Sequence, residues 1–365
     1  MKQRIGILGA GQLGRMMVLE GMPLGLEFVL YEPSGKPTAN VGRIITPETP
    51  DALAAFLDAV DVVTYEFEHL PLAEVEEIAR HKPVYPGVEA LRVCQHRALE
   101  KALFTELGIP TATYRVVNSP EALKSAAGEL GCPVVAKSVT EGYDGKGQAV
   151  LRSPEEAEDA WKRIGHRELI VEAFVNFTRE VSIIAVRSRT GEVRTYPIGE
   201  NLHRDGILRL TRAPAPNLSA TVQKEADAFI TRILNRLDYV GVLALELFET
   251  PDGLLANEMA PRVHNSGHWT QNGAVISQFE NHVRAVAGLP LGCTEARGHT
   301  CMINLVGNLP DREAVLRHPD THLHLYGKSS RPGRKLGHIN VVSDDPAMLD
   351  QRMEAILSTL PDALS

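Results

Sequence analysis

The sequence predicts an α/β amino-terminal region followed by an α+β remainder. Over the first 95 residues, apolar runs typical of buried strands alternate with segments of helical periodicity. From about residue 110 onward, several apolar runs follow one another with few helical segments between them. The chain has 365 residues, which is enough for two or three domains.

The amino-terminal region is predicted to be a parallel, three-layer unit. Strands are expected in RIGILGA, LEFVLYE and DVVTYEFE, and helices in QLGRMMVLE, PDALAAFLDA and PLAEVEEIAR. One longer helix is expected over 90–108, where the alternation stops after Pro86 and Gly87. Because a complete dinucleotide-binding domain usually has six strands, this region is short for that fold.

The first strand and helix enclose the spacing G-x-G-x-x-G over residues 9–14. With Glu32 at the end of the second strand, this pattern is typical of dinucleotide-binding enzymes, so a nicotinamide oxidoreductase is one hypothesis. The unpaired backbone N–H groups at a helix N-terminus can bind any anion that comes close to the backbone. The alternative is therefore a nucleotide substrate bound at this turn, with Gln12 as a polar contact.

The remainder of the chain combines strands with two distinctive loops. Strands are expected in CPVVAKSV, QAVLR, ELIVEAFV, REVSIIAVRS, EVRTYPI and GVLALELFE. A glycine-rich loop, TEGYDGKGQ, separates the first two, and the last 70 or so residues contain a basic stretch, YGKSSRPGRKLGH. These two loops are candidate binding elements.

Composition excludes several classes of protein. The formal net charge of −8 argues against a general nucleic-acid binder, because such proteins place clustered Lys and Arg against phosphates. No apolar run approaches the roughly 20 residues of a membrane helix. The four cysteines form no C-x-x-C pair, which favours reduced thiols. We expect a soluble, cytoplasmic protein.

A predicted hairpin brings two carboxylates together. Strands flank Pro-Asp-Gly at 251–253, which suits a three-residue loop in which Thr250 pairs with Leu254. In that register Glu246 lies directly opposite Glu258, with β-carbons about 5 Å apart. Two like charges so placed repel each other unless a cation lies between them.

The cation expected between these carboxylates is magnesium, which favours a few carboxylate ligands together with substrate phosphates. Asn257 adds another oxygen beside Glu258. The alternative is a register that differs by one residue, so that one of the two glutamates faces water.

Lys137 and the glycine-rich loop predict an anion site. Lys137 ends an apolar strand, where its ammonium needs an anionic partner such as a phosphate. The loop lacks the G-x-x-x-x-G-K-[ST] pattern, so a P-loop NTPase is not expected. The loop is interpreted either as a cationic lid over a bound ligand or as an ordinary turn. It consists of Gly142, Tyr143, Asp144, Gly145, Lys146, Gly147 and Gln148.

Together these features resemble the ATP-grasp enzymes and, more narrowly, the 5-(carboxyamino)imidazole ribonucleotide synthase family of purine biosynthesis. The resemblance covers essentially the whole chain and rests on GAGQLGRM, YEFEHLP, EGYDGKGQ, ENLHRDGIL, NEMAPRVHNSGHWTQ and LYGKSSRPGRKLGHI. It implies a Rossmann-like pre-ATP-grasp domain over 1–95, an ATP-grasp domain over 96–292 and a small C-terminal domain over 293–365. It also suggests a homodimer.

The resemblance implies ATP and magnesium as ligands. Arg97 and Lys137 would contact phosphates, residues 142–148 would close over them, and Glu180 would bind the ribose. The full set assigned to ATP also includes Glu172, Ala173, Phe174 and Val175 beside adenine, together with His203, Asn257 and Glu258. Magnesium would be held by Glu246 and Glu258.

The family's reaction joins bicarbonate to the exocyclic amine of aminoimidazole ribonucleotide, using ATP and a carboxyphosphate intermediate. By resemblance, the catalytic residues would be Asp144, Lys146, Arg262, His264 and Asn265, with His268 a weaker candidate. The residues assigned to the ribonucleotide are Gly11, Gln12, Leu13, Glu66, Lys328, Arg331, Arg334 and Lys335.

Other functions remain as alternatives. Another ATP-grasp ligase, such as a formate-dependent glycinamide ribonucleotide transformylase or a biotin carboxylase, would have a longer chain. A nicotinamide oxidoreductase leaves Glu246, Glu258 and the glycine-rich loop unexplained. A non-catalytic nucleotide-binding regulator would bind ATP without turnover.

Overall fold

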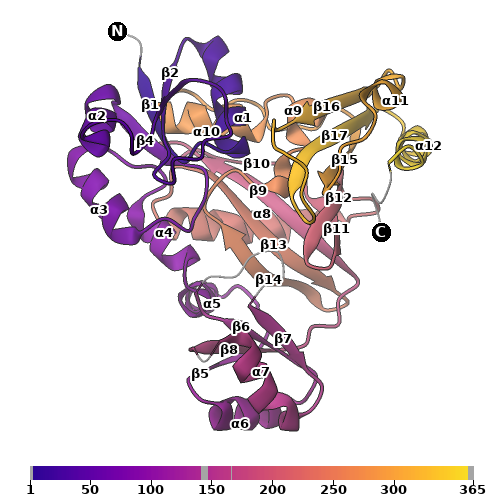
Figure 1. Cartoon of the computed structure of the whole chain (residues 1–365). Coiled ribbons are helices and arrows are strands. Elements are labelled where there is room, and N and C mark those ends of the chain that lie inside the picture. Colours follow the sequence, from indigo (N-terminus) through magenta and orange to yellow (C-terminus); the bar gives the residue numbers. More distant parts are fainter. Residues whose placement is uncertain (1–2, 141–146, 166, 361–365) are drawn as a thin grey trace.

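A computed structural model of the chain describes residues 3–140, 147–165 and 167–360. Its amino-terminal part is a parallel four-stranded sheet in the order β3-β2-β1-β4 (Figure 1). These strands are β1 (Arg4–Leu8), β2 (Glu27–Tyr31), β3 (Arg43–Ile45) and β4 (Val62–Tyr65). Its faces are covered by α1 (Gln12–Gly21) together with α10 (Gln278–Ala287), and by α2 (Ala52–Ala59) and α3 (Leu72–His81). The predicted three-layer unit is confirmed.

The prediction of one helix over 90–108 is wrong, because the helix is interrupted at Gln95 and His96. The structure has α4 (Val88–Cys94) and α5 (Arg97–Glu106) instead. The Gln95 amide donates to the backbone carbonyls of Glu68 and Leu70, both at 2.7 Å, and His96 forms a β-bridge with Thr140. These tertiary contacts outweigh the local helical preference and direct Arg97 toward the centre of the molecule.

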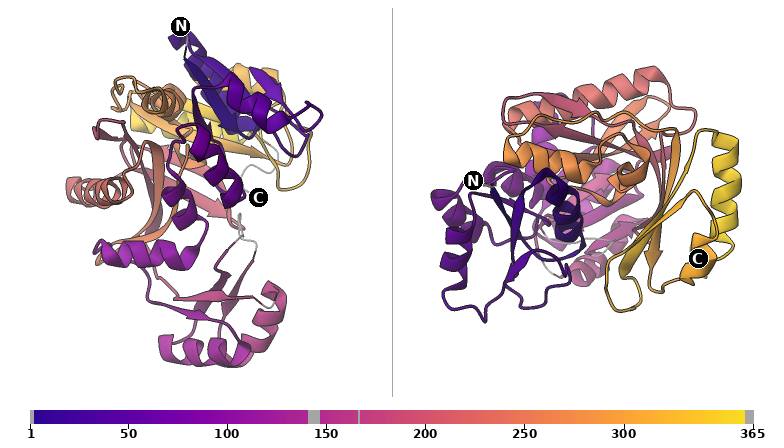
Figure 2. Two further views of the ribbon diagram at one scale, coloured as in Figure 1. Left: turned by 90° about the vertical axis from the view of Figure 1, so that its left-hand side faces the viewer. Right: turned by 90° about the horizontal axis from the view of Figure 1, so that it is seen from above.

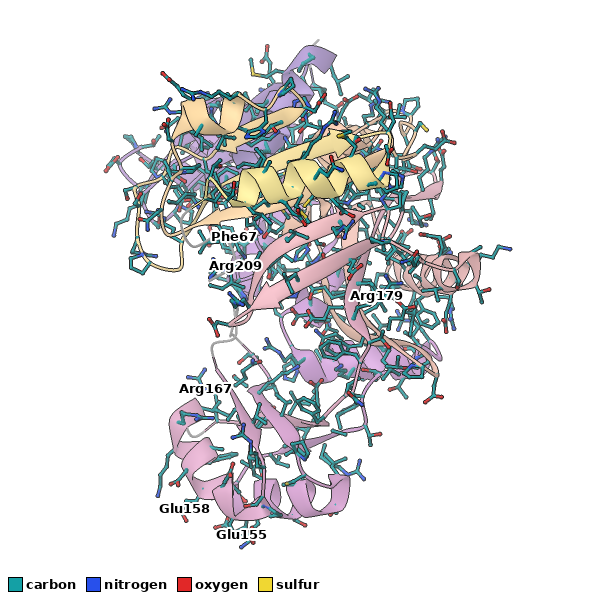
Figure 3. All side chains as sticks on the ribbon, turned by 90° about the vertical axis from the view of Figure 1, so that its right-hand side faces the viewer. Phe67, Glu155, Glu158, Arg167, Arg179 and Arg209 are labelled. Carbon is teal, nitrogen blue, oxygen red and sulfur yellow. The ribbon has the colours of Figure 1, made fainter. Side chains whose placement is uncertain are left out.

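A second, antiparallel four-stranded sheet has the order β5-β8-β6-β7 and projects from the rest of the molecule (Figure 2). It comprises β5 (Tyr114–Val117), β6 (Val134–Ser138), β7 (Gln148–Leu151) and β8 (Leu169–Ala173), with α6 (Pro120–Leu130) and α7 (Ala157–Ile164) on one face. Side chains alternate along β6, so Val134 and Ala136 face those helices while Lys137 faces the opposite side. Figure 3 shows Glu155 and Glu158 at the far end of this region from Phe67 and Arg209.

The large sheet has nine antiparallel strands in the order β14-β13-β9-β11-β12-β15-β17-β16, with β10 also paired to β9. Its strands are β9 (Arg179–Arg187), β10 (Val193–Thr195), β11 (Gly199–Arg204), β12 (Ile207–Ala213), β13 (Gly241–Thr250), β14 (Gly253–Ala260), β15 (His299–Val306), β16 (Thr321–Leu325) and β17 (Lys335–Ser343). The remaining longer helices are α8 (Ala220–Arg236) and α12 (Pro346–Leu357). Strand β15 pairs with β12, so one sheet joins residues on both sides of the predicted boundary between residues 292 and 293. The boundary itself stays a prediction.

A buried histidine joins the amino-terminal sheet to the large sheet. His282 of α10 accepts a hydrogen bond at Nδ1 from the backbone N–H of Val242 (3.0 Å), so Nε2 carries the proton and donates to Thr64 Oγ1 (2.8 Å). Burial lowers the pKa of His282 to about 3, so the ring stays neutral in this role. Within the described ranges, no helix has both the length and the apolar character to cross a membrane.

Candidate functional site

A cavity of about 780 Å³ lies where the two four-stranded sheets and the large sheet meet. This volume is in the range of small-molecule sites. Segments far apart in the sequence contribute to its wall. The predicted residues that line it are Gln12, Leu13, Glu66, Arg97, Lys137, Gln148, Glu172, Ala173, Phe174, Val175, Glu180, His203, Glu246, Asn257, Glu258, Arg262, His264, Asn265, His268 and Lys335.

Most of the glycine-rich loop lies outside the described residues. This applies to Gly142, Tyr143, Asp144, Gly145 and Lys146, whose assigned roles stay predictions. At the end of the loop, the Gly147 carbonyl accepts from Ser138 N (3.0 Å), and Gln148 pairs with Lys137 at the start of β7. The loop is therefore joined to the strand that carries the predicted phosphate-binding lysine.

The hairpin between β13 and β14 places Glu246 opposite Glu258 as predicted, but the turn and the strand register that produce this pairing differ from the prediction. The predicted three-residue loop is wrong, because Thr250 pairs with Gly253 and only residues 251–252 form the turn. Thr250 Oγ1 accepts from Asp252 N (3.2 Å) and donates to the Gly253 carbonyl (2.9 Å). A bulge at Asn257 then shifts the register by one residue, so Glu246 pairs with Glu258.

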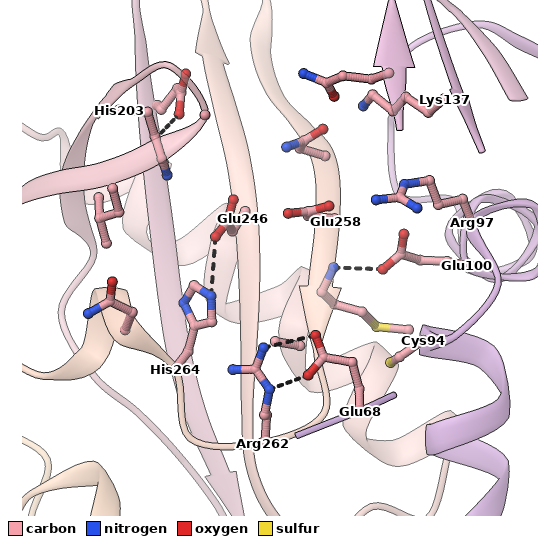
Figure 4. Close-up of a pocket in the computed structure, with 18 of the residues that line it drawn as sticks. Glu68, Cys94, Arg97, Glu100, Lys137, His203, Glu246, Glu258, Arg262 and His264 are labelled. Carbon is pink, nitrogen blue, oxygen red and sulfur yellow. Dashed lines mark hydrogen bonds and ion pairs between the residues drawn. The ribbon is translucent and has the colours of Figure 1, made fainter. Parts of the chain in front are cut away.

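The two carboxylates create an unfavourable charge pair that a cation would relieve. Burial and then the charge of Glu258 raise the pKa of Glu246 to about 7. Figure 4 shows both side chains projecting into the cavity from adjacent strands. No cluster of three or more His, Cys, Asp or Glu side chains that could hold a metal occurs in the part of the chain that the structure describes. A metal here would thus share its coordination between Glu246, Glu258 and a bound phosphate, as magnesium commonly does.

Three side chains on different elements form a buried charged group beside these strands. Glu172 on β8 lies 2.5 Å from Lys137 Nζ on β6 and 3.0 Å from Lys101 Nζ on α5. Burial raises the pKa of Glu172, but the charges of Lys137 and Lys101 outweigh it and lower the pKa to about 2. The Glu172 side chain is thus paired with two lysines, and its assignment beside adenine stays a prediction.

Aromatic and charged side chains complete this half of the cavity. Phe177 and Phe248 stack with ring centroids 4.7 Å apart, and both line the cavity. Glu180 forms an ion pair with His203. Although burial lowers the pKa of His203, the hydrogen bond to Glu180 and the charge of Glu246 together raise it above its ordinary value. The two phenylalanines were missed because isolated aromatic residues on strands carry no pattern that distinguishes a site from a core.

Arg262 is held by Glu68, a residue that sequence reasoning missed. The guanidinium donates from Nη2 to Glu68 Oε1 (2.9 Å) and from Nε to Oε2, which is a bidentate pair (Figure 4). Burial raises the pKa of Glu68, but the Arg262 charge outweighs it and lowers the pKa to about 2. The pair therefore stays ionised at neutral pH and fixes the orientation of Arg262.

The His264 imidazole is a neutral donor next to the carboxylate pair. Its Nδ1 accepts from the backbone N–H of Ser266 (3.3 Å), so the proton is on Nε2, which lies 3.5 Å from Glu246 Oε1. Burial first and then the Arg262 charge lower the pKa of His264 to about 3. Asn265 exchanges amide hydrogen bonds with Asn304, at 3.0 and 2.7 Å.

The N-terminus of the first helix is occupied by a carboxylate of the protein itself, and the assignment of Gly11, Gln12 and Leu13 to the substrate stays a prediction. The Glu66 carboxylate accepts from the backbone N–H groups of Gly11 and Gly14, the latter at 2.7 Å, so an internal anion caps α1. A β-carbon at Gly9 would come within 2.6 Å of Glu66, and one at Gly11 within 2.8 Å. The glycine spacing makes room for Glu66, and Gly11 does not line the cavity.

The basic stretch contributes unevenly to the cavity. Lys335 lines it at the start of β17, and Lys328 donates to Gln12, which lines it as well. Arg331 is exposed, and Arg334 donates to the backbone carbonyl (3.2 Å) and hydroxyl (3.0 Å) of Ser329. These two arginines are not among the residues of the cavity wall, and their assignment to the ribonucleotide stays a prediction.

Comparisons with known proteins match three families in succession along the chain. Residues 1–95 match the ribonucleotide synthetase preATP-grasp domain, residues 102–279 the ATP-grasp domain, and residues 300–352 the phosphoribosylaminoimidazole carboxylase C-terminal domain.

Curated relatives and solved structures match nearly the full length of the chain. N5-carboxyaminoimidazole ribonucleotide synthase of Pseudomonas aeruginosa is 47% identical, over 97% of this chain and 98% of that protein. The structure of the Thermus thermophilus synthetase has a TM-score of 0.93 and 48% identity, covering 98% and 99% of the two chains. The Aspergillus clavatus synthase in complex with ADP and 5-aminoimidazole ribonucleotide has a TM-score of 0.90 and 30% identity, covering 98% of each chain.

Proposed function

This chain belongs to the N5-carboxyaminoimidazole ribonucleotide synthase family, and from that premise we propose that it is an ATP-dependent carbon-nitrogen ligase of purine biosynthesis. It carboxylates the 5-amino group of aminoimidazole ribonucleotide with bicarbonate. The products are 5-(carboxyamino)imidazole ribonucleotide, ADP and phosphate. We assign each substrate to its own group of side chains around one cavity.

The observation that carries this proposal is the closeness of the carboxylate pair to an anion-binding group. His264 Nε2 lies 3.5 Å from Glu246 Oε1, and Arg262 follows Glu258 by four residues on the same segment. A phosphate bound near the carboxylates would therefore be next to an anion held by Arg262 and His264. That neighbourhood is what transfer of a phosphoryl group to bicarbonate requires.

The chemistry explains why cations and donors dominate the cavity. Bicarbonate is a poor electrophile, so one of its oxygens attacks the γ-phosphorus of ATP, ADP leaves, and carboxyphosphate forms. Such a transfer depends on positioning and on charge neutralisation, without a nucleophilic side chain. The amine then takes the carboxyl group, phosphate leaves, and the amine loses a proton, for which Asp144 is the proposed acceptor.

Three residues are proposed to hold bicarbonate and carboxyphosphate. Two N–H groups of Arg262 face Glu68 and one donates to the Val263 carbonyl (3.2 Å), which leaves two of its five for an anion. Neutral His264 offers the Nε2 proton. Asn265 is oriented by Asn304. Lys146 with the rest of 142–148 is proposed to close the cavity against water, since carboxyphosphate hydrolyses readily.

Further ligands and the assembly also belong to the proposal. Glu246, Glu258 and Asn257 would hold magnesium, which would neutralise phosphate charge as it accumulates. Lys335 and Lys328 would bind the phosphate of the ribonucleotide. The family resemblance supports a homodimer in the cytoplasm, and the four free cysteines fit a reducing compartment.

The test is phosphate release from ATP and bicarbonate, with and without aminoimidazole ribonucleotide. Release should rise when the ribonucleotide is present, and Glu258→Gln should abolish the rise while the variant still folds. If the ribonucleotide has no effect on the unsubstituted chain, the assignment is refuted even though the fold stands. A regulator that only binds ATP would show no release in either case.

A further inference from the structure

Lys101 is a buried lysine to which the proposed reaction gives no role. Its side chain is 2% exposed, and its ammonium has four oxygen partners within the protein. These are Thr111 Oγ1 (2.7 Å), the carbonyls of Asn257 (2.9 Å) and Ala256 (3.2 Å), and Glu172 Oε1 (3.0 Å). A lysine buried this completely is strongly unfavourable unless such partners compensate its charge.

Glu172 is shared between Lys101 and Lys137, which differ in their surroundings. Both lysines belong to the cavity wall, but the Lys101 side chain is 2% exposed, whereas the Lys137 side chain is 17% exposed. An incoming phosphate therefore has more access to the ammonium of Lys137 than to that of Lys101. When Lys137 turns to a phosphate, Glu172 keeps one buried cation.

We propose that Lys101 is a positioning residue for the nucleotide: it neutralises Glu172 and so frees Lys137 to bind phosphate. Without Lys101, movement of Lys137 would leave a buried carboxylate with no charge partner, which is costly. Lys137 would then stay on Glu172, and nucleotide binding would weaken. The inference rests on the proposed function only in taking ATP as the ligand.

The same helix also fixes the strand that carries Glu258. Lys101 holds the two carbonyls before Glu258, and its neighbour Glu100 accepts from the backbone N–H of Met259 (2.7 Å) just after it. Helix α5 thus forms hydrogen bonds with the backbone of β14 on both sides of Glu258. Lys101 links the phosphate-binding strand to this segment through Glu172.

The test compares ATP dissociation constants, measured by calorimetry without the other substrates. Lys101→Met should weaken ATP binding at least about tenfold, the loss of one charge-assisted hydrogen bond. Adding Glu172→Gln to it should restore much of the affinity, because the amide leaves no charge behind when Lys137 moves. Lys162→Met, which removes an exposed lysine 2.8 Å from the remote Glu158, is the control and should bind as the unsubstituted chain does (Figure 3).

If Lys101 had only a structural role, the double variant would bind ATP no better than Lys101→Met, and that result would overturn the inference. If Lys101→Met does not fold, a crystal structure of the unsubstituted chain with a non-hydrolysable ATP analogue decides. Lys137 should then contact phosphate while the Lys101 contact to Glu172 persists, and Lys137 still paired with Glu172 would refute the inference. Neither readout needs carboxylation, so failure of the proposed activity would be seen separately.

Discussion

The metal-free chain should become more stable when Glu246 is replaced by Gln. In the structure Glu246 faces Glu258 across the β13–β14 pair, and both are turned into the cavity. Glutamine keeps the size of the side chain and removes its charge. The variant therefore separates the electrostatic cost of the carboxylate pair from its packing.

The magnitude follows from the pKa of Glu246. Burial and the charge of Glu258 raise it from the ordinary 4.5 to about 7. A carboxyl whose pKa is higher in the folded chain favours folding only while protonated, so stability falls as pH rises from 4.5 through about 7. The difference corresponds to about 3 kcal/mol at pH 8 and to less than about 1 kcal/mol at pH 5.

The assay is thermal unfolding with a chelator at pH 8 and pH 5. Glu246→Gln should raise the apparent Tm by several degrees at pH 8 and by little at pH 5. Added magnesium should stabilise the unsubstituted chain and have little effect on the variant, because a ligand stabilises only the state that binds it. Glu192→Gln, at an exposed glutamate paired with Arg194, should change neither result.

Two outcomes would refute this reasoning. If Glu246→Gln is no more stable than the unsubstituted chain at pH 8, the carboxylates do not repel as the structure implies. If magnesium stabilises both proteins equally, the metal binds elsewhere.

Three further predictions concern the anion sites. Glu68→Gln should lower kcat/KM for bicarbonate by about tenfold or more and leave KM for ATP nearly unchanged in steady-state assays, because only Arg262 loses its partner; a selective rise in KM for ATP would contradict this. Lys335→Ala should raise KM for aminoimidazole ribonucleotide far more than Arg331→Ala, since only Lys335 lines the cavity; equal effects would count against the placement. A titration with NADH should show no saturable binding, because Glu66 occupies the helix N-terminus, and tight binding would restore the dinucleotide hypothesis.

Local sequence pattern was enough where one strong signal decides the structure. Continuous apolar runs identify β1, β2 and β4, since strands of a covered parallel sheet are buried on both faces. Strands β11 and β12 were missed because GENLHR and ILRLTRA mix buried and polar residues. The helix over 90–108 was split by contacts of Gln95 with a distant loop, which no local pattern reveals.

The site shows the same division between local and tertiary information. Glu246 and Glu258 were found because both flank one hairpin, even though the turn was mispredicted and the bulge at Asn257 corrected the register. Lys101 and Glu68 were missed because their partners lie on other elements. In the sequence, a lysine in a helix and a glutamate after a strand have the pattern of ordinary surface residues. Their roles follow only from the folded structure, which pairs Lys101 with Glu172 and Glu68 with Arg262.

The central claim is that ATP activates bicarbonate in this cavity, and oxygen transfer tests it most directly. The chain is incubated with ATP, aminoimidazole ribonucleotide and bicarbonate labelled with ¹⁸O, and the released phosphate is examined by mass spectrometry. If a bicarbonate oxygen attacks the γ-phosphorus, the phosphate should carry one labelled oxygen for each ribonucleotide carboxylated. Phosphate without label, formed alongside carboxylated product, would show that ATP is hydrolysed by water and would contradict the account.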